Sequence, residues 1–298
     1  MDDRDVWYNL CQVEGLGSSK FQAVAKRLSD QKLGAASLIG LDASAISSLV
    51  GLRLDLATKL VDQLLSPLKV PVSHEEIRLV LPDDDGYPTF RYLHAVPALP
   101  AYFWVTGSTG LLSREYKTIG IAGSRDTTSD VIELVESFAR KASKSGWLIV
   151  SGLAKGVDTA AHNGAIDGGT GTIGVLAGGI LKAGADYLRT ELDGIAIVSE
   201  FEPLVPWSGP RAMQRNSSIA GLSDRVLVAA SGVSGGSWEM AQLCLKKKKD
   251  LYVFDLPEDV APGNRKLIKA GAKPLDPEDF STGLRDLEPP MDQLFLDD

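Results

Sequence analysis

Residues 147–162 read Trp-Leu-Ile-Val-Ser-Gly-Leu-Ala-Lys-Gly-Val-Asp-Thr-Ala-Ala-His, and this stretch decides the fold class of the chain. The four apolar residues at its start are typical of a short buried strand. A loop with Gly152, Lys155 and Gly156 follows, and a helical pattern begins near Val157. A short apolar strand, a glycine-containing loop and a helix form the repeating unit of a parallel α/β sheet.

The same alternation of strands and helices continues on both sides of this stretch. Helical patterns cover residues 129–145 and 237–249, and the clearer of the two has Val131, Val135 and Phe138 on one face. Candidate strands lie at residues 118–122, 147–151, 172–177, 196–199, 225–230 and 251–254. We therefore predict that residues 118–273 form an extended Rossmann-like parallel sheet with helices on both faces.

Residues 1–66 predict a small all-helical domain of the helix-hairpin-helix or SAM-like type. Gly15-Leu16-Gly17 lies between two helical patterns, and Gly51-Leu52-Arg53 lies between two others. Glycines in such a turn let backbone N–H groups approach a DNA phosphate at a helix start. The second turn has Arg53 where the motif has its last glycine, and a plain helical turn explains both stretches equally well.

The remaining segments are a connector and a tail. Residues 67–117 are rich in proline and predict an extended connector. Residues 274–298 carry eight carboxylates and one arginine, so this tail accounts for −7 of the net charge of −8 and leaves −1 for residues 1–273. The folded body is thus nearly neutral, without the strongly basic footprint of many DNA-binding proteins. Residues 291–296, after Pro289-Pro290, form either a docking peptide for a partner or part of a disordered tail.

Composition excludes several classes of protein. The longest apolar runs are too short to span a bilayer, and the acidic start lacks an apolar signal region, so we expect a cytoplasmic protein without a membrane partner. Cys11 and Cys244 lie far apart, and His74 and His94 fit no three-ligand spacing, so no metal site is predicted.

Glycine, serine and basic residues follow successive predicted strands. In such a sheet the carboxyl ends of the strands form the ligand-binding edge. Exposed backbone N–H groups, helix N-termini and the charges of Arg125 and Lys155 predict an anion site there, with phosphate as the anion. Tight turns alone would explain the glycines but explain the two bases poorly. The residues of these loops are Gly123, Ser124 and Arg125, then Gly152, Lys155 and Gly156, then Gly235 and Ser237.

Other patterns are weaker. Gly169-Thr-Gly171-Thr-Ile-Gly174 matches the dinucleotide fingerprint as a string but leads into a strand, and no Walker A sequence is present, so no cofactor is expected. Asp158 and His162 share a helix face near Ser151, which fits either a hydrolytic triad or, as we favour, a buried hydrogen-bonded histidine.

Two basic features have both a functional and a structural interpretation. Arg215-Asn216 can contact phosphates and bases, or Arg215 can form a structural ion pair with Asp224 or Glu200. The lysines at 246–249 close a helix, where positive charge suits the helix dipole, and a DNA contact is the second interpretation.

Several motifs in order resemble the DNA-processing protein A family (DprA/Smf). They are Asp84-Asp85-Gly86-Tyr87-Pro88, Gly123-Ser124-Arg125, residues 151–162, residues 172–179, Ser199-Glu200, Arg215-Asn216 with residues 219–223, and Gly263-Asn264. The resemblance implies sequence-independent binding of single-stranded DNA, dimerisation and loading of a RecA-type recombinase, as in natural transformation, without catalysis. It also implies that Arg125 and Lys155 contact phosphate, and that Gly123, Ser124, Gly152, Gly156, Arg215, Asn216, Gly235, Ser237 and Asn264 form the floor and rim of the site.

The chain departs from the family pattern near this site, at residues 234–241, at Tyr187-Leu188 and at Leu256-Pro257-Glu258, and it lacks the winged-helix segment often found at the C-terminus. These departures leave a role in recombination or defence open beside transformation. Gly235-Gly236-Ser237-Trp238-Glu239 faintly resembles the loop of nucleotide-cleaving phosphoribohydrolases. Such an enzyme, or a nucleotide-sensing module, is therefore the alternative function.

Overall fold

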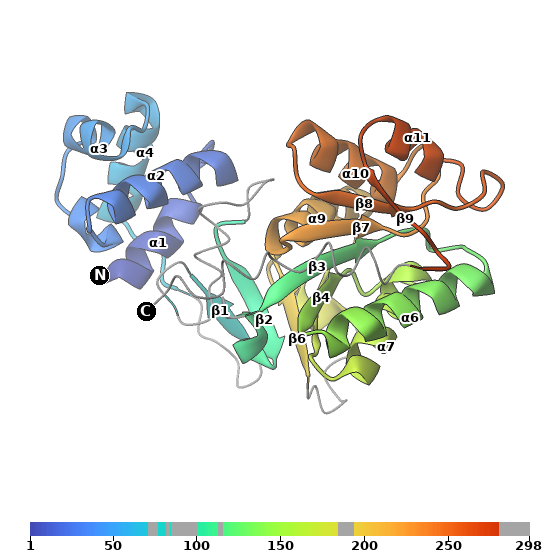
Figure 1. Cartoon of the computed structure of the whole chain (residues 1–298). Coiled ribbons are helices and arrows are strands. Elements are labelled where there is room, and N and C mark those ends of the chain that lie inside the picture. The colour runs from blue at the N-terminus through green and yellow to red at the C-terminus, as the bar shows by residue number, and fades with distance from the viewer. Residues whose placement is uncertain (71–76, 82–83, 85–99, 113–115, 184–193, 280–298) are drawn as a thin grey trace, which may run out of the picture. The chain divides into compact units, whose positions relative to one another are not determined.

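The computed structural model describes residues 1–70, 77–81, 84, 100–112, 116–183 and 194–279 (Figure 1). The chain divides into two compact units. Unit 1 comprises Met1–Tyr116 and Ile173–Leu222, and unit 2 comprises Lys117–Thr172 and Ser223–Asp298. The domain boundaries that the sequence predicts after residues 66, 117 and 273 remain predictions.

Unit 2 contains a parallel sheet in the order β4-β3-β7-β8-β9. The strands are β3 (Lys117–Ala122), β4 (Trp147–Ser151), β7 (Arg225–Val228), β8 (Leu251–Phe254) and β9 (Lys273–Leu275). β4 is buried along its whole length, as expected for a strand covered on both faces. All five strands run the same way, so their carboxyl ends meet at one edge.

Helices cover both faces of this sheet (Figure 1). On one face lie α6 (Ser129–Lys144) and α7 (Val157–Gly168), and on the other lie α10 (Gly236–Lys246) and α11 (Asn264–Lys269). The side chain of Thr128 caps α6 by accepting a hydrogen bond from the N–H of Val131. Phe138 of α6 meets Phe254 of β8 edge to face at 5.7 Å, in the middle of a core rich in valine, isoleucine and alanine.

Unit 1 combines a second group of strands with helices. β1 (Arg78–Val80) pairs antiparallel with β2 (Phe103–Gly107), and β2 pairs antiparallel with β6 (Ile195–Ser199). β5 (Thr172–Val175) neighbours β6 in the sheet. The short helices η2 (Thr109–Leu112) and η3 (Ile180–Lys182) and the longer α9 (Gly209–Leu222) complete this part.

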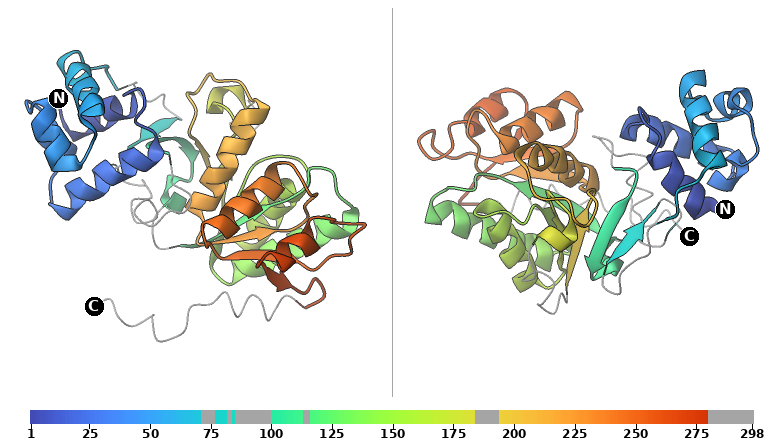
Figure 2. Two further views of the ribbon diagram at one scale, coloured as in Figure 1. Left: turned by 90° about the horizontal axis from the view of Figure 1, so that it is seen from above. Right: turned by 180° about the vertical axis from the view of Figure 1, so that it is seen from behind.

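The N-terminal part of unit 1 is helical, as predicted (Figure 2). It consists of α1 (Asp3–Cys11), α2 (Ser18–Asp30), η1 (Ala35–Leu38), α3 (Ala43–Val50) and α4 (Leu54–Leu65). Trp7 of α1 packs on Phe21 of α2 with ring centroids 5.3 Å apart. Phe21, Leu28, Ile46 and Leu60 are almost fully buried, so this part has an apolar core of its own.

The predicted fold class is confirmed: an α/β arrangement with a largely parallel sheet, preceded by helices. All six predicted strands are present, and β4 and β8 have the predicted bounds. The sequence analysis missed β1, β2 and β9. The first two lie in the segment that we expected to be an extended connector.

Candidate functional site

The loops after β3 and β4 lock together at the carboxyl edge of unit 2. Gly156 has φ of 77°, and a Cβ there would lie 2.6 Å from the carbonyl oxygen of Ser124. A Cβ on Gly123 would lie 2.6 Å from a methyl group of Val157. The N–H of Val157, the first residue of α7, donates to the Ser124 carbonyl at 3.2 Å. Both glycines are therefore required by close approach, and the structure brings the loops of Arg125 and Lys155 together as predicted.

Arg125 and Lys155 are both exposed on these interlocked loops. Ser124, by contrast, is used within the protein. Its N–H donates to the carbonyl of Ala230 at 2.9 Å, and its hydroxyl donates to the carbonyl of Asp126 at 2.6 Å. The site therefore presents two exposed cationic side chains on interlocked loops, whereas Ser124 shapes the loop.

The loop after β7 is tied to the same edge by Asn264. The Asn264 side chain accepts from the N–H of Ser231 at 3.0 Å and donates to the carbonyls of Ala229 and Phe254 at 2.9 Å each. It is fully buried, so it holds the loop and cannot itself reach a ligand. Gly235 is exposed, with φ of 93°, and α10 starts after it without a side-chain cap.

Ser151, Asp158 and His162 do not form a hydrolytic triad. The Ser151 hydroxyl donates to the carbonyl of Ile121 at 2.7 Å. Nε2 of His162 accepts from the N–H of Leu153, whose φ is 49°, and Nδ1 faces the hydroxyl of Thr172 at 2.8 Å. That hydroxyl itself donates to the carbonyl of Ile149 at 2.8 Å, so both ring nitrogens of His162 are engaged within the protein and neither faces Ser151. His162 therefore supports the Gly152–Gly156 loop, which is the interpretation that we favoured.

Arg215 lies inside unit 1 rather than on its surface. Its side chain is 3% exposed and donates to the carbonyl of Val175 at 3.2 Å. Glu200 lies close enough for its charge to interact with Arg215, and Glu200 also accepts hydrogen bonds from Ser218 and Gln214 at 2.6 Å each. Burial raises the pKa of Glu200, and these partners oppose the rise. The geometry thus favours the structural interpretation of Arg215, while its neighbour Asn216 is half-buried.

The sequence analysis missed an exposed aromatic feature in unit 1. Trp207 is 58% exposed in the segment between β6 and α9. The backbone beneath it is held firmly, because the N–H of Gly179 donates to the Val205 carbonyl at 2.7 Å and Arg211 donates to the Pro206 carbonyl at 2.9 Å. A large exposed ring on a fixed backbone is a suitable platform for stacking. Its only signal in the sequence was the run Pro206-Trp207-Ser208-Gly209-Pro210.

Comparison with known proteins identifies the family of this chain. The model for the family DNA recombination-mediator protein A matches residues 78–284. The chain belongs to this family. It is 33% identical over 196 residues to DNA processing protein DprA of Bacillus subtilis, covering 62% of this chain and 64% of that protein. It is 28% identical over 291 residues to protein Smf of Escherichia coli, covering 91% of this chain and 72% of that protein. The match thus spans about two thirds of the length of these relatives.

Solved structures of the family share the fold. DNA processing protein A from Streptococcus pneumoniae superposes with a TM-score of 0.71 and 23% identity, over 95% of this chain and 98% of that chain. DNA processing protein A from Helicobacter pylori, described for its single-stranded DNA binding mode, gives a TM-score of 0.60 and 22% identity, over 72% and 96%. The resemblance deduced from the motifs is confirmed.

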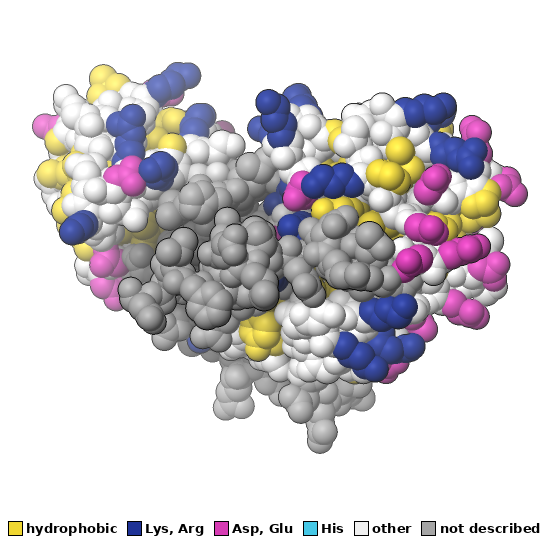
Figure 3. Space-filling model, in the orientation of Figure 1, with side chains coloured by type: hydrophobic (Ala, Val, Ile, Leu, Met, Phe, Trp, Pro, Cys, Tyr) yellow, Lys and Arg dark blue, Asp and Glu magenta, His cyan; other side chains and the backbone are white. Residues whose placement is uncertain are grey.

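Carboxylates also lie at the carboxyl edge of unit 2. Figure 3 shows a group of Asp and Glu side chains on the face of unit 2 that it displays. Asp126 and Asp130 follow Arg125 and are exposed, and Asp255, after β8, forms an ion pair with Arg265 at 3.7 Å. The carboxyl edge is therefore of mixed charge, and anion binding there depends on local cations rather than on a broad positive field.

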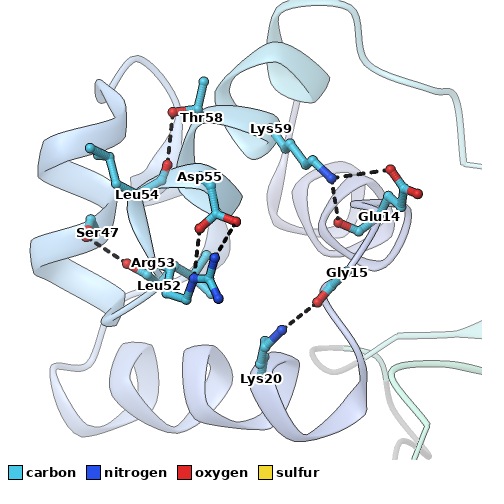
Figure 4. A network of polar contacts seen from close by, with 10 residues as sticks. All are labelled: Glu14, Gly15, Lys20, Ser47, Leu52, Arg53, Leu54, Asp55, Thr58 and Lys59. Atoms are coloured by element: carbon cyan, nitrogen blue, oxygen red, sulfur yellow. Dashed lines mark hydrogen bonds and ion pairs between the residues drawn. The ribbon is translucent and has the colours of Figure 1, made fainter.

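The two helix-hairpin-helix candidates differ (Figure 4). In the first, Gly15 has φ of 87°, Gly17 begins α2 without a side-chain cap, and Lys20 donates to the Gly15 carbonyl at 2.8 Å. In the second, Arg53 begins α4 and pairs with Asp55 at 3.0 Å, and this hydrogen bond lowers the pKa of the Asp55 carboxyl. A carboxylate already lies at the start of α4, so only the first turn keeps the geometry of a phosphate contact.

Some expectations concern residues outside those that the structure describes. They are the motif at residues 85–88, the histidines at 74 and 94, the departure at 187–188 and the docking segment at 291–296. Within the described residues, no helix is long and apolar enough to cross a membrane, and no group of three or more His, Cys, Asp or Glu side chains is arranged to hold a metal ion.

Proposed function

We propose that this chain binds single-stranded DNA without sequence preference and presents it to a RecA-type recombinase. The observation that carries the proposal is the pair of exposed cations, Arg125 and Lys155, on two loops locked together through Gly156. Two cationic side chains at one edge fit neighbouring phosphates of a strand. Family membership and the single-stranded DNA binding described for the Helicobacter pylori relative support this assignment.

A preference for single strands requires contacts with bases, and Trp207 offers a separate candidate for them within unit 1. Every base has an aromatic face, so stacking on Trp207 would favour a strand with open bases and be tolerant of sequence. Gly235 and Ser237 remain candidate contacts at the rim of the edge in unit 2, and Asn216 remains a candidate contact in unit 1. Asn264 acts on this edge only through the backbone that it holds, and Arg215 holds backbone within unit 1.

The test is a salt titration of oligonucleotide affinity for Arg125→Ala and Lys155→Ala. Each variant should lose about 1–3 kcal/mol of binding free energy, the range for hydrogen bonds to charged groups. The slope of log affinity against log salt should flatten by about 0.7 per lost phosphate contact. Arg140→Ala is the control for loss of one positive charge, because the Arg140 side chain is 41% exposed and paired with Asp167 in the same unit. An unchanged slope with a lowered melting temperature would show that the pair is structural.

The recombinase role and the absence of catalysis need separate tests. Strand exchange by a RecA-type recombinase on DNA covered with a single-strand-binding protein should begin sooner when the chain is added, and no effect would restrict the function to DNA binding. We also propose a homodimer in the cytoplasm and no chemical step. Release of a free base from nucleoside monophosphates would contradict the last point and favour the phosphoribohydrolase alternative.

A further inference from the structure

The amino ends of the strands in unit 2 carry a row of cations that the proposed function does not use. β3 begins with Lys117, β7 with Arg225 and β9 with Lys273, and the parallel order places these starts at one edge, opposite the Arg125 loop. The last turn of α6 adds Lys144 beside β4. From β4 to β9 the edge is about 19 Å long, at about 4.8 Å per strand.

Aromatic rings and one carboxylate hold these cations in position. Arg225 and Lys117 lie over the ring of Trp147, at 5.5 Å and 6.0 Å from its centre. Asp250 is shared, because Arg225 lies 3.7 Å and Lys273 lies 2.7 Å from its two oxygens. Lys117, Arg225 and Lys273 carry three positive charges against the two carboxylates Asp224 and Asp250, so the group keeps a positive charge, and the Lys273 side chain is still 53% exposed.

Further lysines enlarge this excess. Helix C-termini at this edge contribute about −0.5 charge each, which would by itself repel an anion. The full charges of the side chains outweigh that contribution. The described cations at the strand starts and at the ends of α6, α10 and α11 are Lys117, Lys141, Lys144, Arg225, Lys246, Lys247, Lys248, Lys249, Lys266, Lys269 and Lys273. The described carboxylates there are Asp224, Asp250 and Asp167, which pairs with Arg140.

We propose that this amino edge is a second nucleic-acid site, which takes the phosphate backbone of a DNA segment distinct from the strand at the Arg125 loop. The proposal rests on the proposed function in assuming DNA as the ligand. A row of about 19 Å reaches roughly five phosphates at a rise of 3.4 Å each. The rings of Trp147 and Tyr252 are at most 5% exposed, so they cannot stack on bases. The site therefore contacts only the phosphate backbone and binds duplex as readily as single-stranded DNA.

The experiment removes the loop site first. Arg125→Ala with Lys155→Ala should leave salt-sensitive binding of a short DNA duplex, measured by fluorescence anisotropy. Adding Lys144→Gln and Lys248→Gln, both exposed, should then weaken this binding and flatten its salt slope by about 1.8, at 0.9 per phosphate contact. The matched control adds Lys32→Gln and Lys69→Gln instead, because Lys32 and Lys248 are both exposed lysines with left-handed backbones, at φ of 55° and 57°.

The outcomes separate this inference from the proposed function. If the loop variant keeps full single-strand affinity, the Arg125 and Lys155 assignment fails, and the amino edge is then tested by the same lysine pairs in the wild-type background. Equal slopes for the amino-edge and control pairs would overturn the amino-edge site. A synthetic peptide of residues 276–298 is the competing ligand, because it carries the charge of the acidic tail. Binding of that peptide with no residual duplex binding would also overturn the DNA assignment.

Discussion

Replacing Asn264 by alanine distinguishes two roles for this residue, support of the loop backbone and direct contact with the ligand. The side chain is fully buried and makes three hydrogen bonds to backbone groups of Ser231, Ala229 and Phe254, at 2.9–3.0 Å. A neutral hydrogen bond contributes about 0.5–1.5 kcal/mol net, so Asn264→Ala should lower the free energy of unfolding by about 2–4 kcal/mol. Asn264→Asp keeps the shape but turns a carboxylate toward two carbonyl oxygens, and should cost at least as much.

Urea unfolding followed by circular dichroism measures this loss. Asn163→Ala is the matched control, because Asn163 is an exposed asparagine of α7 in the same unit, and its change should stay within about 0.5 kcal/mol. Below the unfolding transition, Asn264→Ala should bind single-stranded DNA with an unchanged salt slope. An unchanged urea midpoint together with a flattened salt slope would refute the reasoning, because it would show that Asn264 contacts phosphate directly.

The remaining predictions address a glycine, a buried acid and an exposed ring. Gly156→Ala should lower the melting temperature and abolish DNA binding, because its Cβ would lie 2.6 Å from the Ser124 carbonyl. Gly235→Ala, where φ is 93° but the space around the Cβ is open, should lose only about 1–3 kcal/mol of stability, through backbone strain. Burial raises the pKa of Glu200, so its contribution to stability is present below its ordinary value of 4.5 and is lost as the pH rises through the raised value. Urea midpoints should therefore show the wild type losing stability relative to Glu200→Gln as the pH rises above about 4.5. Trp207→Ala should weaken single-strand affinity by about 1–3 kcal/mol and leave duplex affinity unchanged, as measured by anisotropy.

Each of these has an outcome that contradicts it. Equal effects of the two glycine substitutions would mean that close approach to Ser124 does not matter. A stability difference between wild type and Glu200→Gln that is independent of pH would show that burial of the ionised Glu200 carboxylate does not lower stability. Equal losses for single-stranded and duplex DNA in Trp207→Ala would exclude stacking on bases as the reason for any single-strand preference.

The sequence predicted the strands whose apolar runs are longest and failed where pairing partners lie far away. β4 and β8 are continuous apolar runs and were located with their bounds. β1 and β9 have three residues each, too few for a pattern to emerge, and β9 begins with Lys-Pro. β2 was missed because the many prolines before it are typical of a connector. Its antiparallel partner β6 lies far along the chain and leaves no signal in the local sequence.

The sequence predicted where the candidate site lies in the fold, but not which of its side chains face solvent and which face the interior. The rule that strand ends share one edge was sufficient to bring Arg125 and Lys155 onto adjacent loops. Sequence alone could not show that Asn264 and Arg215 face the interior, because a polar residue in a loop or at a helix start fits a rim contact as well as a backbone support. Burial depends on which elements pack above the residue, and that is a property of the tertiary fold.

Charge arrangement, rather than total charge, decides how a chain of net charge −8 can bind DNA. The two cations at the carboxyl edge give a shallow salt dependence, with a slope of about −1.4 for a single strand, so electrostatics alone would hold DNA weakly at cellular salt. Carboxylates nearby, such as Asp126 and Asp130, weaken the long-range attraction further. Tight binding of a single strand at the carboxyl edge would therefore require a contribution that salt does not screen, such as stacking of bases on an exposed ring. A duplex cannot use stacking without unpairing, so a site of weak electrostatic attraction that relied on stacking would bind single strands in preference to duplex.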